Sequence, residues 1–442
     1  MAEPVPTPAD PPWARGLPVR RHAGRGDARD LAHRVGAALA RHAGADPATE
    51  PRGASRGPGG APTEHVPLPR VTGRVLAEDV EAACAVPHYA SSAMDGYAVR
   101  GPGPWELVSG DSPSARSGPG APVPLPSAAS AGALAPGTAV PVVTGGVIPE
   151  GTTSVVREEF SCRSGSIVRL APGAPPSELE GRHIRATGTE CQVHEVLFHA
   201  GRVLSPADAA FAAVAGLDHL PVRRAPRVAL LLTGSEVRTS GVPAPGLVRD
   251  AFSMSVPHAV TAYGGVPGTV HRVHDDPASL STAFREVCAE HDVVLTTGGT
   301  SRSGVDHVRP MLERETRVLV DQLDLQPGHP ALLGAARRSA VLALPGNPLA
   351  ALVVVLLVGG PLLAGFSGRA APGLVPVTVG VDAAGGRREK LVPARRRGNA
   401  WEPCRAVGPN MLRGLSEAEG LLSIPRAGLV PGDRTVVLPL PW

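Results

Sequence analysis

The stretch from Arg227 to Gly368 constrains the fold most, because apolar strand patterns alternate with helical patterns along its whole length. Alternation of this kind predicts βαβ units and a mostly parallel sheet covered by helices on both faces. The predicted elements are strands at 227–234, 268–273, 293–295, 317–320 and 340–344, helices at 253–263 and 278–291, a further helix after the glycine-rich turn, and an apolar helix at 349–365.

The apolar helix, LAALVVVLLVGGPLLAG, resembles a membrane span. It is slightly short of the ~20 residues that a span needs, and Gly359, Gly360 and Pro361 interrupt it. We predict that it is buried inside a soluble α/β domain and that the protein has no contact with a membrane. No amino-terminal segment joins a basic start to an apolar core, so we expect a cytoplasmic protein.

Short β runs flank the α/β stretch on both sides, and a length of 442 residues is enough for roughly three domains. Between 82 and 170, runs at 96–99, 105–108, 139–143, 154–157 and 167–170 predict a small β domain, with a surface loop at 112–132. The residues from 371 to 442 predict a small β barrel or sandwich. Residues 1–26 have no periodic pattern and are predicted to be disordered, whereas 27–42 predict an amphipathic helix.

Charge and cysteine usage exclude several classes of protein. The 43 basic and 40 acidic residues leave a net charge of +3, which is too weak a field to indicate nucleic-acid binding. The five cysteines are scattered, and no two of them have C-x-x-C spacing. We therefore expect neither a disulfide framework nor a zinc site.

Three strand ends in the α/β stretch carry small polar or glycine-rich loops. In an open α/β sheet, ligands bind at the carboxyl ends of the strands. The loops begin at Thr233, at Thr297 and at Leu344, and they offer backbone donors and hydroxyls suited to an anionic ligand. None matches a Walker or a Rossmann glycine motif.

The second of these loops ends the sequence DVVLTTGGTSRSGVD, which predicts an anion site. Gly298 and Gly299 lack a Cβ atom, so their backbone N–H groups could approach a bound anion closely. Thr300 and Ser301 add hydroxyl donors, and Asp306 could hold a metal over a bound phosphate. The alternative interpretation is an ordinary strand-to-helix turn.

Two further polar segments precede the α/β stretch. SSAMDGY places the acid Asp95 beside a glycine, and Thr144 precedes two more glycines. Residue types alone favour a polar turn in a β domain for the first segment. His329, in QPGHP, is likewise typical of a surface turn.

Several motifs together resemble one family: SSAMDGYAVR, VVTGGVIPEGTTSVV, LLLTGSEV, VVLTTGGTSRSGVDHV, QPGHPALLG and LPGNPLAALV. Their order and spacing are similar to those of the molybdopterin molybdenumtransferases, the MoeA and gephyrin E-domain family, from about residue 27 to the carboxyl terminus. The resemblance implies four parts: a linker region at 27–81 and 171–221, a small β domain at 82–170, a molybdopterin-binding α/β domain at 222–370 and a carboxyl-terminal β domain at 371–442.

The resemblance also implies an activity and an assembly. Such proteins take adenylylated molybdopterin and molybdate, release AMP with Mg²⁺ as cofactor, and leave molybdenum on the dithiolene sulfurs. They are homodimers, in which the β domain of one subunit would bring Asp95 and Thr144 to the three loops of its partner. Other proteins of molybdenum cofactor biosynthesis are further expected partners.

Site residues carry over by motif. The expected catalytic residues are Asp95, Thr144, Glu190, Asp306 and His329, and Asp306 is also the expected metal ligand. The expected cofactor-binding residues are Thr233, Gly234, Ser235, Asp250, Thr297, Gly298, Gly299, Thr300, Ser301, Pro345, Gly346, Asn347 and Pro348.

The sequence also departs from the family pattern at the expected site. The family usually has acids at Ser235, Thr189 and Gly304, and lysines at Gln326 and His329. Magnesium affinity should suffer most, because charge count tunes the binding of hard cations. One hypothesis is that Arg302 and His329 supply the missing positive charge. The others are a non-catalytic molybdopterin-binding paralogue that acts as carrier or scaffold, and substitutions that lie outside the working site.

Overall fold

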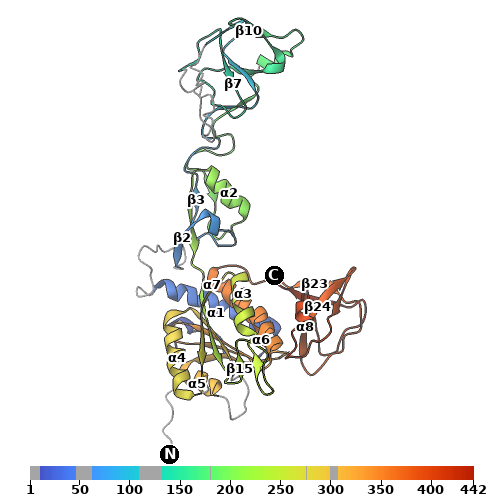
Figure 1. Ribbon diagram of the computed structural model, residues 1–442. Helices are drawn as coiled ribbons and strands as arrows, with labels where there is room; N and C mark the ends of the chain where they lie inside the picture. The colour runs from blue at the N-terminus through green and yellow to red at the C-terminus, as the bar shows by residue number, and fades with distance from the viewer. Residues whose placement is uncertain (1–9, 46–61, 109–131, 180, 275, 299–306) are drawn as a thin grey trace, which may run out of the picture. The chain divides into compact units, whose positions relative to one another are not determined.

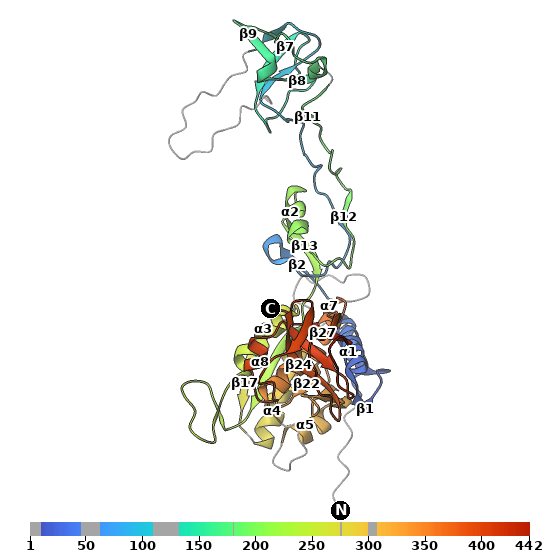
Figure 2. The same cartoon turned by 90° about the vertical axis from the view of Figure 1, so that its right-hand side faces the viewer.

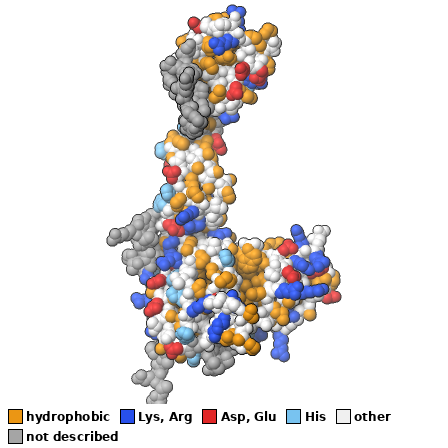
Figure 3. All heavy atoms as spheres, in the orientation of Figure 1, with side chains coloured by type: hydrophobic (Ala, Val, Ile, Leu, Met, Phe, Trp, Pro, Cys, Tyr) orange, Lys and Arg blue, Asp and Glu red, His pale blue; other side chains and the backbone are white. Residues whose placement is uncertain are grey.

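The computed structural model describes residues 10–45, 62–108, 132–179, 181–274, 276–298 and 307–442. The chain forms two compact units. The α/β unit comprises Met1–Glu78, Ala200–Ser205 and Leu220–Trp442, and the inserted unit comprises Asp79–His199 and Pro206–His219. Basic and acidic side chains are interspersed on the face shown in Figure 3.

A seven-stranded sheet forms the centre of the α/β unit. In order across the sheet, its strands are β1 (Arg20–Ala23), β19 (Arg317–Leu323), β21 (Leu332–Ala335), β22 (Ala340–Leu344), β18 (Val293–Thr297), β14 (Arg227–Thr233) and β17 (Val266–Val273). Strand β21 runs antiparallel to both neighbours, and the four other pairs are parallel. The predicted mostly parallel sheet is therefore confirmed.

Helices cover both faces of this sheet (Figure 1). The helices on one face are α1 (Arg25–Ala45), α3 (Phe252–Ala262), α6 (Pro348–Val354) and α7 (Gly360–Ser367), and those on the other are α4 (Pro277–Glu290) and α5 (Val308–Glu315). Successive side chains of β18 alternate between the two cores, with Val293 and Leu295 in one and Val294 in the other. This alternation explains the continuous apolar run that the sequence shows.

The apolar helix is a core helix, as predicted. A π-helical turn at Val355–Gly359 joins α6 to α7, and together they form a continuous helix of 20 residues. It is long and apolar enough to cross a membrane, yet its most apolar window is 100% buried inside the protein. The sheet and the neighbouring helices therefore supply the apolar surroundings that its composition requires.

The predicted disorder of residues 1–26 is wrong for the part that the structure describes. A 3₁₀ turn, η1 (Pro12–Ala14), buries Trp13, whose indole N–H donates to the carbonyl of Ala336 over 3.1 Å. The next strand, β1, then pairs with β19 at the sheet edge. The error has a physical cause, because a strand added to a sheet edge draws its stability from distant residues and needs no periodic pattern of its own.

Helix α1 confirms the helix predicted at 27–42. It crosses α7 in the α/β unit at very short range. A Cβ atom on Gly36 would lie 2.0 Å from the carbonyl oxygen of Leu362, and one on Gly365 would lie 2.0 Å from that of His33. An amphipathic pattern predicts that one helix face is buried, but it does not reveal which element covers that face.

The carboxyl-terminal β domain closes into a barrel, one of the two forms predicted. Its strands are β23 (Val375–Thr378), β24 (Glu389–Arg397), β25 (Ala400–Pro403), β26 (Gly420–Ile424) and β27 (Arg434–Pro439). An isolated bridge between Val379 and Trp401 joins the end of β23 to β25 and completes the ring. The short helix α8 (Arg413–Ser416) precedes β26, and β20 (Leu325–Gln326), from the chain between β19 and β21, pairs with β24.

The inserted unit contains the predicted small β domain, visible in Figure 2 with β7, β8 and β9 labelled. Its six-stranded sheet has the order β8 (Ser154–Arg157), β5 (Gly96–Val99), β7 (Thr138–Val142), β6 (Trp105–Leu107), β10 (Ile167–Leu170) and β9 (Ser161–Ser164). Trp105 is fully buried in the core of this sheet. The strand predictions are confirmed, and all but one residue of the insert at 112–132 lies outside the described residues.

Short strand pairs and one helix extend the inserted unit beyond the small β domain. They are β3 (Val80–Glu81) with β12 (Val196–Phe198), β4 (Ser91–Ser92) with β11 (Ile184–Arg185), and helix α2 (Pro206–Val214). In the linker region, β2 (Thr63–Pro67) pairs with β13 (His219–Arg223).

Candidate functional site

The three predicted loops meet in the α/β unit. They line a cleft of about 450 Å³ at the carboxyl ends of β14, β18 and β22. The predicted residues that line the cleft are Thr233, Asp250, Thr297, Gly298, Gly346, Asn347 and Pro348. Gly234 and Ser235 line a smaller hollow of about 180 Å³ that also touches Thr233, and Pro345 is buried.

The first two loops are held together at their strand ends. The hydroxyl of Thr233 donates to the carbonyl oxygen of Thr297 over 2.8 Å. Gly298 follows with a φ of +81°, and a Cβ atom there would lie 2.5 Å from the Thr233 hydroxyl. Glycine is therefore required at this position for both backbone and steric reasons.

The third loop begins the long core helix. Asn347 has extended backbone angles and no capping bond from its side chain, and Pro348 occupies the first helical position. Gly346 and Asn347 are both exposed in the cleft. The positive end of the helix dipole lies at this loop, which favours a negatively charged ligand.

The sequence analysis missed two polar residues of the cleft, Arg249 and Asn410. A third, Glu236, lies in the first predicted loop but was not among the expected binding residues. Asn410 comes from the carboxyl-terminal domain, in a Gly-Pro-Asn turn that gave no signal beyond that of an ordinary turn. The turn is fixed to the cleft because the amide of Ala350, in α6, donates to the carbonyl of Pro409 over 3.2 Å. Arg249 is the last residue of the short strand β16 (Val248–Arg249), and Glu236 directly precedes the short strand β15 (Val237–Arg238).

Asp250 has a structural task at the cleft wall. Its carboxylate accepts hydrogen bonds from the amides of Phe252 (2.9 Å) and Ser253 (3.1 Å) at the start of α3, and it forms an ion pair with Arg272. Burial raises the pKa of Asp250, but the bonds from Ser253 and the Arg272 guanidinium outweigh burial and hold this pKa below its usual value. The side chain is thus ionised and committed to holding α3.

We expect D250N to lower the free energy of unfolding by about 1 to 2 kcal/mol, because the amide loses the Arg272 ion pair and weakens the bonds to α3. Because the pKa of Asp250 is lower in the folded protein than in the unfolded chain, its carboxylate stabilises the fold fully at a pH above the ordinary carboxyl pKa. This stabilisation is lost as the pH falls through the lowered pKa of the folded state. Urea denaturation should therefore show the difference between wild type and D250N closing below about pH 4.

The matched control is D276N. Asp276 accepts from the amide of Ser279 over 2.8 Å at the start of α4, with no ion pair among the described residues. Asparagine caps helices as well as aspartate does. D276N should therefore change stability by only a few tenths of a kcal/mol, and an equal loss in both variants would contradict the assigned role of Arg272.

In the inserted unit, Asp95 and Thr144 form one pair, although 49 residues separate them in the sequence. The backbone N–H and the hydroxyl of Thr144 donate to Asp95 Oδ1 over 2.6 and 2.9 Å. These two bonds hold the pKa of Asp95 below its usual range, and the carboxylate is exposed. Gly96 permits the turn, because a Cβ atom there would lie 2.0 Å from the carbonyl oxygen of Val156.

Glu190 is also exposed in the inserted unit, but it lies in the turn where its amide donates to the carbonyl of Val86. No contact with Asp95 or Thr144 is found for it in the described chain. Residues Gly299, Thr300, Ser301, Arg302, Gly304 and Asp306 lie outside the described residues. Within the described ranges, no group of three or more His, Cys, Asp or Glu could hold a metal ion.

His329, the residue suggested to supply positive charge, has contacts at both ring nitrogens. Its Nδ1 lies 2.6 Å from the carbonyl oxygen of Leu323 and therefore donates, whereas its Nε2 lies 3.1 Å from Nη2 of Arg388. Arginine can only donate, so Nε2 is the acceptor in this contact. His329 does not line the cleft, and it lies beside the barrel strand β24, where the neighbouring Gln326 pairs with Lys390.

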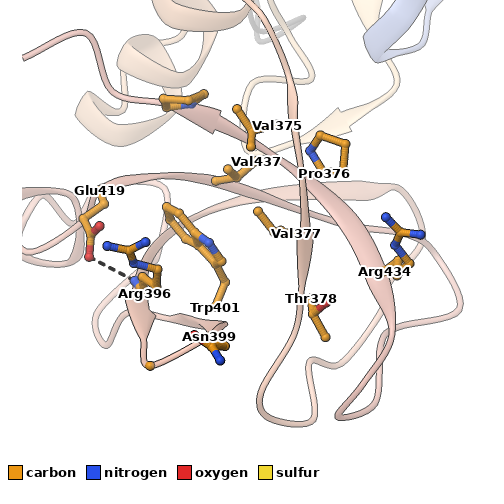
Figure 4. A pocket seen from close by; sticks show the side chains of 12 residues that line it. Val375, Pro376, Val377, Thr378, Arg396, Asn399, Trp401, Glu419, Arg434 and Val437 are labelled. Atoms are coloured by element: carbon orange, nitrogen blue, oxygen red, sulfur yellow. Dashed lines mark hydrogen bonds between the residues drawn. The ribbon is translucent and has the colours of Figure 1, made fainter.

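A separate hollow of about 590 Å³ lies in the barrel and contains none of the predicted site residues. Figure 4 shows Trp401 near Val377 and Val437, with Arg396 and Arg434 on opposite sides. The Arg396 amide donates to the carboxylate of Glu419 over 3.0 Å. The residue types are mixed, and the strand-end cleft remains the better candidate for an anionic ligand.

Comparisons with known proteins show which family the chain resembles. Residues 35–216 match the family described as MoeA N-terminal region (domain I and II), and residues 229–365 match a probable molybdopterin binding domain. Molybdopterin molybdenumtransferase 2 of Mycobacterium tuberculosis is 32% identical over 302 residues, which cover 65% of this chain and 71% of that protein. The molybdopterin molybdenumtransferase of a Nostoc strain is 31% identical over 331 residues, 72% of each chain.

The fold is similar to that of a solved structure. The crystal structure of a molybdopterin biosynthesis MoeA protein from Pyrococcus horikosii superimposes with a TM-score of 0.67 at 23% sequence identity, covering 86% of this chain and 94% of that one. At this identity the likeness shows a shared fold.

Proposed function

This chain belongs to the molybdopterin molybdenumtransferase family, and from that premise we propose that it inserts molybdate into adenylylated molybdopterin with release of AMP. The reaction is a step of molybdenum cofactor biosynthesis. The observation that carries the proposal is the single cleft into which the three strand-end loops and Asn410 converge.

The chemistry of the cleft suits this substrate. Cleavage of a phosphoanhydride requires donors and positive charge around the phosphoryl oxygens. The helix dipole at the amino terminus of α6 and the guanidinium of Arg249 place positive charge at one cleft. We propose that the pterin substrate lies with its phosphates toward the third loop, at Gly346 and Asn347.

We propose that the protein works as a homodimer, in which the Asp95 and Thr144 pair of one subunit faces the cleft of its partner. The pair supplies an exposed carboxylate that is charged at neutral pH. Glu190 would lie in the same catalytic region. We further propose a cytoplasmic location and contact with other proteins of molybdenum cofactor biosynthesis.

Magnesium is the proposed cofactor and, when bound, would neutralise phosphate charge. Hard cations require several oxygen ligands. Two carboxylates, those of Glu236 and Asp250, line the described part of the cleft. Asp250 forms an ion pair with Arg272, whereas the Glu236 carboxylate has no partner among the described residues. We propose that Glu236 and Asp306 hold the ion together with phosphate oxygens, so a poorer magnesium affinity than usual in the family is expected.

The decisive experiment supplies purified protein with adenylylated molybdopterin, molybdate and Mg²⁺, and measures AMP release and formation of molybdenum cofactor. Both products should form, and chelation of the metal should stop AMP release. Binding of the pterin without AMP release would instead support a carrier or scaffold.

N410A should raise the KM for adenylylated molybdopterin about tenfold, because a hydrogen bond to a charged ligand contributes about 1.5 kcal/mol. The exposed N399A variant in the barrel is the matched control, since it removes the same side chain outside the cleft. We expect N399A to leave the KM unchanged. Equal KM values for N410A and wild type would remove Asn410 from the binding site.

A further inference from the structure

We propose that the amino-terminal segment forms a phosphate-binding site that shares no residue with the strand-end cleft. A hollow of about 340 Å³ lies between the turn at 15–17 and one face of α1. Three arginines line it: Arg15 from the turn, and Arg34 and Arg41 from the helix. No acidic residue lines it.

The three guanidinium groups share two properties in the described part of the chain. None of them has a hydrogen-bond or ion-pair partner within the part of the chain that the structure describes, and all three side chains are exposed. Other arginines of the same unit, such as Arg224 with Asp292 and Arg309 with Asp321, are paired. Within the described residues, these three guanidiniums around one hollow are therefore available to an anionic ligand.

The local charge points the same way. Residues 10–45 contain seven arginines and three aspartates, with no lysine or glutamate, so this short segment is more positive than the whole chain at +3. Three arginines around one hollow suit a phosphate, because the planar guanidinium binds phosphate oxygens in pairs.

Both walls of the hollow are held in place without a ligand. On the turn side, Arg317 donates to the carbonyls of Ala14 (2.6 Å) and Leu17 (3.1 Å), and Trp13 is anchored on Ala336. On the other side, α1 is fixed by its close glycine crossing with α7. A site with walls held in this way loses little conformational entropy on binding.

The size of the site fits one or two phosphate groups. Arg34 and Arg41 lie seven residues apart on α1, about 10 Å along the helix axis. Between them, Ala37 and Ala38 are small, and a Cβ atom on Gly16 would meet no atom within 4 Å. The long arginine side chains can thus reach toward a small phosphate-bearing molecule, whether inorganic phosphate, diphosphate or a nucleotide.

Calorimetric titration of the full-length protein at constant ionic strength tests the proposal. Phosphate, diphosphate and 5′-AMP are compared, and the affinity lost between wild type and R34Q/R41Q measures binding at this hollow. We expect at least a tenfold loss for the preferred ligand. If the double variant loses affinity for 5′-AMP alone, a nucleotide is the source of the phosphate. If it loses as much affinity for diphosphate as for 5′-AMP, the inorganic anion is the ligand.

The matched control is R20Q/R21Q, which removes two exposed arginines of β1 outside the hollow. We expect its affinities to stay within twofold of wild type. A37E, which places an acid in the hollow, should abolish binding there. Equal weakening by R20Q/R21Q and R34Q/R41Q would reduce the effect to diffuse charge attraction and overturn the proposal, as would equal affinities in wild type and A37E.

AMP release separates this inference from the proposed function. R34Q/R41Q should keep wild-type AMP release in the absence of added phosphate, because neither arginine lines the strand-end cleft. A loss of phosphate binding with unchanged AMP release supports a second site. A loss of both would place the arginines in the catalytic site and overturn it.

Discussion

D95N is expected to reduce the rate of AMP release about 100-fold, the usual effect of removing one preorganised charge or donor at a reacting centre. Two hydrogen bonds from Thr144 hold the pKa of Asp95 below its usual range, so the carboxylate is charged at neutral pH. The amide oxygen of asparagine can still accept both bonds. The variant therefore removes the charge while it keeps the turn.

The control for D95N is E106Q, which neutralises another exposed carboxylate on β6 of the same unit. E106Q should leave AMP release within twofold of wild type. Because the Asp95 pKa is lowered, wild-type activity should show no decline from this group as pH falls from 8 to 5. A loss of less than threefold in D95N would exclude Asp95 from the reaction.

Mixed dimers extend this experiment to the proposed assembly. The G346W side chain should fill the cleft without disturbing the fold, since a Cβ atom at Gly346 has no neighbour within 4 Å. If each site combines two subunits, a dimer of D95N and G346W retains one intact site and about half the activity. If each site belongs to one subunit, the mixed dimer is inactive, which would contradict the shared site.

G365A is expected to lower the free energy of unfolding of the α/β unit by about 3 kcal/mol. The added methyl group would lie 2.0 Å from the carbonyl oxygen and 2.8 Å from the carbonyl carbon of His33. Both are backbone atoms of α1, so no side chain can rotate away. The two helices must separate, and the apolar core between them loses contact.

G359A is the matched control, because Gly359 lies in the same continuous helix and is also buried. Its added methyl group would meet no atom closer than 3.7 Å, an ordinary contact distance. Alanine favours a helix over glycine by up to about 1 kcal/mol, so G359A should be neutral or stabilising. Urea denaturation followed by circular dichroism checks both variants, and equal midpoints would contradict the close crossing.

The periodic segments could be predicted from the sequence because their burial is local and regular. The pattern from Arg227 to Gly368 predicted the strands β14, β18 and β22 and the helices between them, and it therefore located the three loops of the cleft. The short runs between 82 and 170 were equally clear, because glycine and proline end each strand.

The contacts that join distant segments could not be predicted. Asn410 reaches the cleft only because Pro409 bonds to the first turn of α6, and β1 forms only because β19 offers a free edge. His329 carried a family expectation of positive charge at the site, yet its ring contacts Leu323 and Arg388 outside the cleft. In each case the contacting residue is distant in the sequence, or the contact depends on a geometry that residue types alone do not reveal.

The sequence by itself determined the α/β alternation, the small β domain, the family and the loops that carry the chemistry. These follow from the periodicity of burial and from residue types at fixed spacing, which are properties of the chain. The tertiary structure alone decided which loops share a cleft, which carboxylates are committed to helix ends, and where unpaired arginines gather. Those features depend on distances between segments, and such distances exist only once the chain has folded.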